Sequence, residues 1–237
     1  ELVRPERMWT FSSHSMPWQM LVDVGYHEPD LVSEDSRIFM QGFLHYEGDY
    51  RVTPVYLPVH MDAVEGETFW ASLKALYKQQ RRWAWGVEHL PYMIAEFRKH
   101  PKIPKRLKRR FLFNHLEGMY TWTTAPILIF MLGYLPFFVA GDTTSALIAN
   151  APFSLERMMQ VATIGVFASG LMSFFFLPPR PKGVKKWNWG IMILQWALLP
   201  ITFVLFGALP AIDAQTRFML GKYLGFNVTK KLKRDQV

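Results

Sequence analysis

The sequence predicts an integral membrane α-helical domain that follows the end of a polar domain, with an amphipathic helix at the boundary. The 237-residue chain is uneven, because 15 of its 19 acidic residues and all seven histidines lie within residues 1–117. Three long uncharged runs fill most of the remainder. The mean hydropathy of +0.04 therefore averages a polar half and a lipid-like half. These observations place the membrane domain in the second half.

Composition excludes several classes of protein and site. Half of the residues are hydrophobic and 16% are aromatic, which excludes intrinsic disorder for most of the length. The chain has no cysteine, so disulfides, a thiolate nucleophile and cysteine-based zinc or iron–sulfur sites are excluded. The net charge of +8 indicates an anionic partner. Because the basic blocks are not interleaved with aromatic residues on a soluble module, we expect that partner to be anionic lipid and not nucleic acid.

The first predicted helix covers residues 33–46. Ser33 is placed to cap it, and Glu34 and Asp35 occupy its first turn, where the helix dipole favours negative charge. Its predicted apolar face consists of Ile38, Phe39 and Phe43. A cap followed by acidic residues is common at the start of a helix, so a purely structural interpretation of Ser33-Glu34-Asp35 remains open.

A strand is predicted next, over Arg51–His60. The stretch is rich in valine and other residues that favour extended backbone. Pro54 and Pro58 lack the amide hydrogen that a central strand would donate, so we expect an edge or irregular strand.

A longer amphipathic helix is predicted to start near Thr68. Its apolar residues recur at steps of three and four, and they are Phe69, Trp70, Leu73, Leu76, Tyr77, Trp83, Ala84 and Val87. Lys74, Lys78 and Arg81 lie among them. Since a basic, tryptophan-bearing helix ahead of a membrane domain favours the lipid headgroup layer, we expect it to lie there. Packing on a soluble core is the alternative.

Each of the three uncharged runs is long enough to span a bilayer. They are Gly118–Gly141, Met158–Pro179 and Trp187–Ile212, of 24, 22 and 26 residues, whereas a spanning helix needs about 20. Buried helices of a large soluble protein are the alternative, but little polar surface would remain to cover them.

Basic residues around the three runs predict the orientation of the chain in the membrane. The block from Arg98 to Arg110 and the loop Arg180–Lys186 are basic, whereas Asp142–Ser154 has no lysine or arginine. Residues 1–110 and the basic loop are therefore expected in the cytoplasm, and Asp142–Ser154 outside. The basic tail of residues 227–237 breaks this rule unless the third run bends near Pro200 or lies partly in the interface.

Three residues of the amphipathic helix suggest a binding face. Gln79, Arg82 and Trp83 are at positions i, i+3 and i+4, which share one side of a helix. A guanidinium donates two parallel hydrogen bonds to a diphosphate, and an indole offers a flat apolar surface to a sugar ring. The alternative is an arginine and a tryptophan that only contact the membrane interface.

Together the two motifs resemble the C-terminal half of membrane-bound family 2 glycosyltransferases, the group of cellulose, chitin and hyaluronan synthases. The resemblance rests on Ser33-Glu34-Asp35, on Gln79-x-x-Arg82-Trp83 and on the transmembrane segments that follow. It implies that Asp35 is the catalytic base with Glu34 beside it, and that the Gln79–Trp83 segment lies over the nucleotide diphosphate and the acceptor. Ser13, His14 and Ser15 stand where that family has an acceptor-binding loop. Serine at position 33 departs from the threonine that is usual there.

The resemblance also implies parts that this chain lacks. The family's catalytic domain is an α/β fold of the GT-A type, in which an Asp-x-Asp holds a divalent metal, Mg or Mn. No Asp-x-Asp occurs here, so we expect the metal ligands and the donor-binding half in a missing N-terminal part, in the same or a partner chain. The expected organisation is the end of the catalytic domain over residues 1–66, the interface helix and basic segment over 67–115, and the transmembrane domain over 116–237.

The resemblance implies an inverting, processive transfer of sugar from a nucleotide-sugar donor to a growing polysaccharide, which the transmembrane helices extrude. Its location would be the plasma membrane, or the inner membrane of a bacterium, as a multi-pass protein. We expect the fragment alone to be inactive. Two alternatives remain: transfer of a single sugar to a lipid acceptor, and a non-catalytic membrane scaffold or export subunit.

Overall fold

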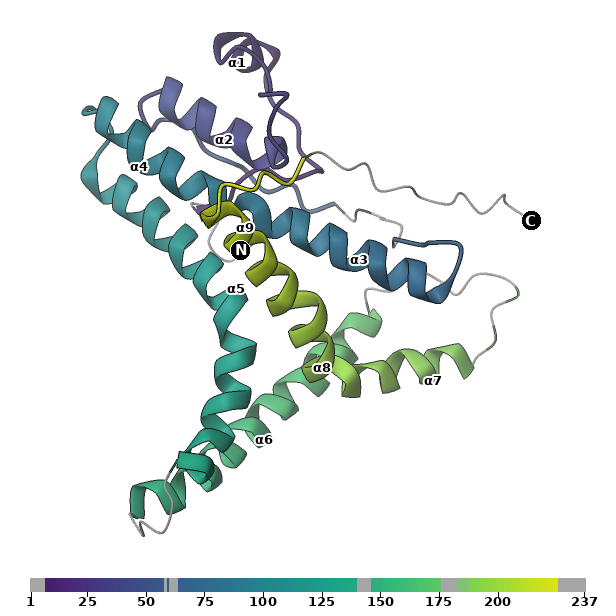
Figure 1. The fold of residues 1–237 in the computed structure, drawn as a ribbon. Coiled ribbons are helices and arrows are strands. Elements are labelled where there is room, and N and C mark those ends of the chain that lie inside the picture. Colours follow the sequence, from purple (N-terminus) through teal and green to yellow (C-terminus); the bar gives the residue numbers. More distant parts are fainter. Residues whose placement is uncertain are drawn as a thin grey trace. The chain divides into compact units, whose positions relative to one another are not determined.

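The computed structural model describes residues 7–57, 59, 64–139, 146–175, 183, 185 and 187–225. Its contacts divide the chain into two units, one of residues 1–123 with 209–237 and one of residues 124–208. The described parts of both units are helical and contain no strand (Figure 1). Residues 209–212, at the C-terminal end of the third uncharged run, therefore belong to the first unit, as do residues 118–123 at the start of the first run.

The first predicted helix is confirmed as α2, Glu34–His45, which follows the short α1, Trp18–Asp23. Ile38, Phe39 and Phe43 of its apolar face are all buried. Ser33 occupies the N-cap position, but its side chain makes no capping hydrogen bond. The expected cap is therefore correct in position and wrong in its interaction.

The predicted strand over Arg51–His60 is wrong for the residues that the structure describes, which are 51–57 and 59. None of them belongs to a strand. Val55, Tyr56 and Leu57 are more than 70% exposed, so no described element covers this stretch. The physical reason is that Pro54 cannot donate to a ladder, and the described residues offer no neighbouring strand.

The amphipathic helix is confirmed as α3, Phe69–Ala84, and Thr68 caps it by accepting a hydrogen bond from the amide of Ala71 at 3.2 Å. The predicted apolar pattern continued to Val87, whereas the α-helix ends at Ala84 and tightens into a 3₁₀ turn, η2, over Trp85–Glu88. At this turn the carbonyl of Gly86 accepts a hydrogen bond from the ring of His115 at 3.0 Å. Helix α4, His89–Lys99, follows directly.

The larger core of the first unit lies between α2, α4 and the start of α5, Lys105–Val139. Figure 1 shows α2 beside α4. The eight buried residues of this core are Phe39, Met40, Phe43, Leu44, Met93, Phe97, Ile103 and Phe111. The basic block 98–110 is thus divided between the end of α4, a turn and the first residues of α5.

A second, smaller core joins α3 to the C-terminal helix α9, Leu209–Met219. Its buried members are Val32, Ala84, Trp85, Ala211 and Ala214. The alanines allow the two helices to approach closely. Since Val32 directly precedes the Ser33-Glu34-Asp35 motif and Ala84 directly follows Trp83, this core holds the ends of both motifs.

The second unit contains the end of α5, then α6 over Ala146–Phe175 and a broken helix formed from α7, Trp187–Leu194, and α8, Leu199–Phe203. A 3₁₀ turn, Gln195–Leu198, separates α7 from α8, and a π-helical turn, Val204–Ala208, follows α8. Gly170 of α6 lies against the indole of Trp196, since a Cβ atom there would be 3.2 Å from the ring. The absence of a side chain at Gly170 permits this contact.

The three uncharged runs are helical wherever they are described, but their limits differ from the prediction. Helix α6 begins at Ala146, so much of the loop expected over Asp142–Ser154 is helical, and residues 142–145 lie outside the described part. Among the described residues, no single helix meets the length and hydropathy requirements of a membrane span. One bent pair, Gly190–Leu198 with Ile201–Met219, meets them together at an angle of 61°. The basic tail also lies outside the described residues.

Candidate functional site

Asp35 lies in the first turn of α2, as the sequence predicted, and its side chain is half-buried. Its backbone carbonyl accepts a hydrogen bond from Thr10 Oγ1 at 2.6 Å. No hydrogen bond or ion pair joins its carboxylate to any residue that the structure describes. Asp35 therefore combines a held main-chain carbonyl with a carboxylate that none of the described residues engages. Glu34 beside it is half-buried, and its Oε2 is buried without a described partner.

The second motif lies at the C-terminal end of α3. Gln79 and Arg82 are half-buried, and Trp83 is 52% exposed. The indole therefore presents a partly open apolar surface while the two polar side chains stay close to the protein. An exposed tryptophan on a helix end is suited to stacking against a ring.

The structure brings the ends of the two motifs together in the first unit. Val32, Ala84 and Trp85 share one buried cluster. The hydroxyl of Ser33 donates a hydrogen bond to Oε1 of Glu88, which lies five positions after Trp83. Two segments separated by more than forty residues in sequence thus meet through apolar packing and one buried polar contact.

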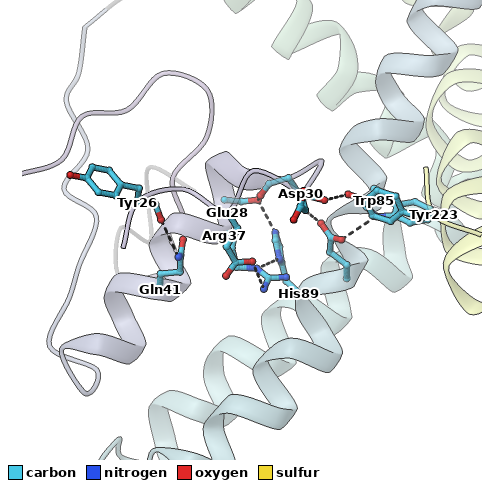
Figure 2. Close-up of polar contacts among 11 residues, drawn as sticks. Tyr26, Glu28, Asp30, Arg37, Gln41, Trp85, His89 and Tyr223 are labelled. Atoms are coloured by element: carbon cyan, nitrogen blue, oxygen red, sulfur yellow. Dashed lines mark hydrogen bonds and ion pairs between the residues drawn. The ribbon is translucent and has the colours of Figure 1, made fainter. Parts of the chain in front are cut away.

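Glu88 is the centre of this junction. Its second oxygen, Oε2, accepts a hydrogen bond from the indole Nε1 of Trp85 at 3.1 Å, and the residue is 7% exposed. Burial raises the pKa of the Glu88 carboxyl, while the hydrogen bond from Ser33 and the charge of Arg37 lower it. Figure 2 shows Trp85 on one side of this network and His89 and Arg37 on the other.

Ser36 and Arg37 hold the imidazole of His89 (Figure 2). Nδ1 of His89 accepts from Nε of Arg37 at 3.2 Å, and Nε2 lies 2.8 Å from Oγ of Ser36. Because a guanidinium can only donate, Nδ1 is unprotonated and Nε2 carries the hydrogen. Ser36 accepts that hydrogen and donates to the carbonyl of Ser33 at 3.1 Å. The imidazole therefore cannot take a proton from Ser36, which excludes an activated serine nucleophile.

Burial keeps two histidines of this region neutral. Burial, then the charges of Arg37 and His115, lower the pKa of His89 to about 2. Burial also lowers the pKa of His115 to about 4, against a smaller opposing effect of its hydrogen bond to the carbonyl of Gly86. Trp9 stacks on His115 with ring centroids 5.1 Å apart. The rings thus fill the core as uncharged aromatic groups.

Two residues from the C-terminal part of the first unit, Asp213 and Tyr223, contact the segments that form the junction. Asp213 of α9 accepts a hydrogen bond from Arg81 at 2.7 Å, so the α3 arginine next to Arg82 is paired across helices. Tyr223 donates its hydroxyl hydrogen to the carbonyl of Asp30 and meets Trp85 edge to face (Figure 2). Asp213 and Tyr223 therefore hold the helix that carries Arg81 and the loop that carries Asp30.

The expected acceptor loop is not joined to these residues by any described contact. Ser13 and Ser15 are exposed, and His14 is half-buried with its Nδ1 against the carbonyl of Phe11. The ring of His14 lies 6.2 Å from that of His27. The structure therefore places the three residues in a loop before α1 and gives them no described contact with Asp35 or with residues 79–83.

A shallow groove of about 240 Å³ lies elsewhere in the first unit and contains none of the motif residues. Its lining is polar and includes Asp23, Glu28, His45, Tyr92 and Glu96. Within the described residues, no group of three or more histidines or carboxylates is placed to hold a metal ion. We therefore assign no metal ligand among these residues.

Sequence reasoning missed Glu88, His89, Arg37 and Asp213. Glu88 and His89 interrupt an otherwise apolar stretch from Trp83 to Leu90, and this was the available signal. A buried carboxylate in such a stretch needs donors, but the sequence alone does not say which ones.

Comparisons with known proteins give no assignment. No protein-family model, no curated protein and no solved structure matches the chain.

Proposed function

We propose that this chain is the C-terminal part of a membrane-embedded, inverting glycosyltransferase that adds sugars from a nucleotide-sugar donor to a growing polysaccharide. The observation that carries the proposal is the junction of the two motifs. The core of Val32, Ala84 and Trp85, with the Ser33–Glu88 hydrogen bond, brings the end of the Ser33-Glu34-Asp35 motif to the end of the Gln79–Trp83 segment. A base, a diphosphate ligand and a sugar-stacking surface need such proximity to act on one substrate.

Asp35 is assigned as the general base of this reaction. The acceptor hydroxyl attacks the anomeric carbon, the bond from that carbon to the diphosphate breaks, and the hydroxyl proton passes to the Asp35 carboxylate. A single displacement inverts the anomeric centre. The carboxylate is suited to this role because it is uncommitted among the described residues while Thr10 fixes its main chain.

Arg82 and Trp83 are assigned to the leaving group and the acceptor. The guanidinium of Arg82 would stabilise the negative charge that develops on the departing diphosphate. Trp83, at 52% exposure, would stack on a sugar ring of the acceptor, and Gln79 on the same helical face would donate to a sugar hydroxyl. These roles give each residue of the motif a separate contact.

The membrane assignment belongs to the same proposal. Side chains of α6 that include Val161, Ile164, Phe167 and Leu171 are all more than 60% exposed within the described chain. Such a band of apolar surface is favourable in lipid and unfavourable in water. We assign the donor-binding half and its divalent metal to another part of the enzyme. Residues 1–110 of this chain are assigned to the cytoplasmic side of the membrane.

The test uses membranes that contain the complete enzyme and a panel of radiolabelled uridine diphosphate sugars. The Asp35→Asn variant keeps size and hydrogen bonding but cannot accept the proton, so incorporation should fall by about 100-fold or more. Glu34→Gln, which changes the adjacent carboxylate in the same way, is the matched control and should lose far less. Near-normal incorporation by Asp35→Asn would overturn the assignment. Absence of transfer by the wild-type enzyme would favour the scaffold alternative.

A further inference from the structure

We infer that Glu88 is a positioning residue that fixes Asp35 relative to the helix of Gln79, Arg82 and Trp83. The inference rests on the proposed function. It gives a role to a buried carboxylate that lies outside both motifs and that no step of the proposed reaction uses.

Ser33 supplies the first part of the argument. A serine at an N-cap normally accepts a hydrogen bond from an amide of the first turn. Here the hydroxyl of Ser33 donates to Glu88 instead, and no side-chain cap is made. The first residue of the Ser33-Glu34-Asp35 motif is therefore tied to the turn that follows α3 and not to its own helix.

Trp85 supplies the second part. Its Nε1 donates to Oε2 of Glu88 at 3.1 Å, and the indole is 1% exposed. One carboxylate thus connects the residue before Glu34 with a residue two positions after Trp83. Because both contacts are buried, water does not compete for either oxygen.

His89 extends the same connection along α2. It contacts Ser36 at 2.8 Å and Arg37 at 3.2 Å, so Glu88 and His89 together bind residues on both sides of Asp35. Thr10 holds the carbonyl of Asp35 itself. The main chain around Asp35 is fixed from three directions while none of the described residues engages its carboxylate, which is the arrangement that a positioned base requires.

Two substitutions at Glu88 distinguish the effect of side-chain length from the effect of negative charge. Glu88→Gln keeps the length of the side chain, since the amide oxygen can accept from Trp85 while the amide nitrogen donates to the oxygen of Ser33. Glu88→Asp keeps the charge but is one methylene shorter, so it cannot contact both partners. A positioning role depends on reach, whereas a role in proton transfer depends on the carboxylate.

The experiment measures sugar transfer by the complete enzyme, with kcat and the donor KM referred to the amount of folded protein from size-exclusion chromatography. We expect Glu88→Asp to lower kcat by about 10-fold with the donor KM unchanged, and Glu88→Gln to stay within about 3-fold of wild type. The double variant Ser33→Ala with Glu88→Asp should have the same kcat as Glu88→Asp alone, because both substitutions break the same Ser33–Glu88–Trp85 connection. Glu96→Asp on α4 is the matched control and should retain wild-type kcat.

Three results would overturn the inference. An inactive Glu88→Gln with an active Glu88→Asp would make Glu88 a proton-transfer group. A normal kcat per folded molecule in Glu88→Asp, with only the yield reduced, would make it a structural residue. If the wild-type enzyme transfers no sugar from any donor, the proposed function fails and the positioning role with it. The first two results leave the proposed function standing, so the two failures are distinguishable.

Discussion

His89 and His115 show how single buried side chains make the first unit sensitive to acid. Their pKa values are lowered to about 2 and about 4, below the ordinary value of about 6.5. For a group whose folded pKa is lowered, the stabilising contribution is complete above the unfolded pKa and is lost as the pH falls below it. The loss therefore begins near pH 6.5 and continues through pH 5, because the unfolded chain binds protons that the folded chain cannot.

We predict that the free energy of unfolding falls by about 2 kcal/mol for each of these two histidines between pH 7.5 and pH 5. The melting temperature of the detergent-solubilised chain, followed by tryptophan fluorescence, measures this. His89→Gln should remove about half of the fall, since its amide does not titrate and can still contact Ser36 and Arg37. His27→Gln removes an exposed ring and serves as the control. An unchanged pH dependence in His89→Gln would contradict the prediction.

At the scale of elements, the pair Arg81–Asp213 connects α3 with α9 across 132 positions of sequence. Its nitrogen–oxygen distance is 2.7 Å, and its two side chains are only 19% and 24% exposed. Asp213 also accepts from Arg217 of its own helix at 2.6 Å. Most surface ion pairs are weak because solvent screens them and because two mobile side chains must be ordered. Here partial burial reduces the screening, and the contact with Arg217 already orders the Asp213 carboxylate.

A double-mutant cycle on Arg81→Ala and Asp213→Ala should give a coupling free energy of about 1 kcal/mol. The chain offers a matched control in Lys99–Glu96, which has the same 2.7 Å distance but a lysine that is 67% exposed. That pair lies within one helix, and its coupling should be about 0.3 kcal/mol. Both cycles are measured from thermal unfolding. Equal couplings would show that burial does not strengthen the Arg81–Asp213 pair.

For the whole molecule, the uncharged runs make a prediction about where the chain is found. Helix α6 carries at least four apolar side chains that are more than 60% exposed within the described chain, and their exposure to water would be unfavourable by about 25 cal/mol per Å². We therefore expect the chain to sediment with membranes, to resist extraction by alkaline carbonate and to require detergent. Recovery of the chain in the soluble fraction after the carbonate wash would remove the membrane assignment. A cytoplasmic protein expressed alongside it controls for incomplete washing.

Local chemistry in the sequence determined α2 with Asp35 in its first turn, the start of α3 near Thr68 and the helical state of the uncharged runs. These features depend on neighbours within a few residues, so periodicity and capping residues reveal them. The strand expected over Arg51–His60 failed because a strand needs a partner, and the described residues supply none.

Only the tertiary structure decided what Ser33 does. Its capping position is local, but the buried carboxylate of Glu88, 55 positions away, takes the hydroxyl instead. A capping bond contributes about 1 kcal/mol, whereas a hydrogen bond to a charged group contributes about 1.5–3 kcal/mol. The stronger of the two bonds determines the position of the Ser33 hydroxyl. The same reasoning applies to Arg81 and Asp213, since long-range partners leave no periodic trace in the sequence.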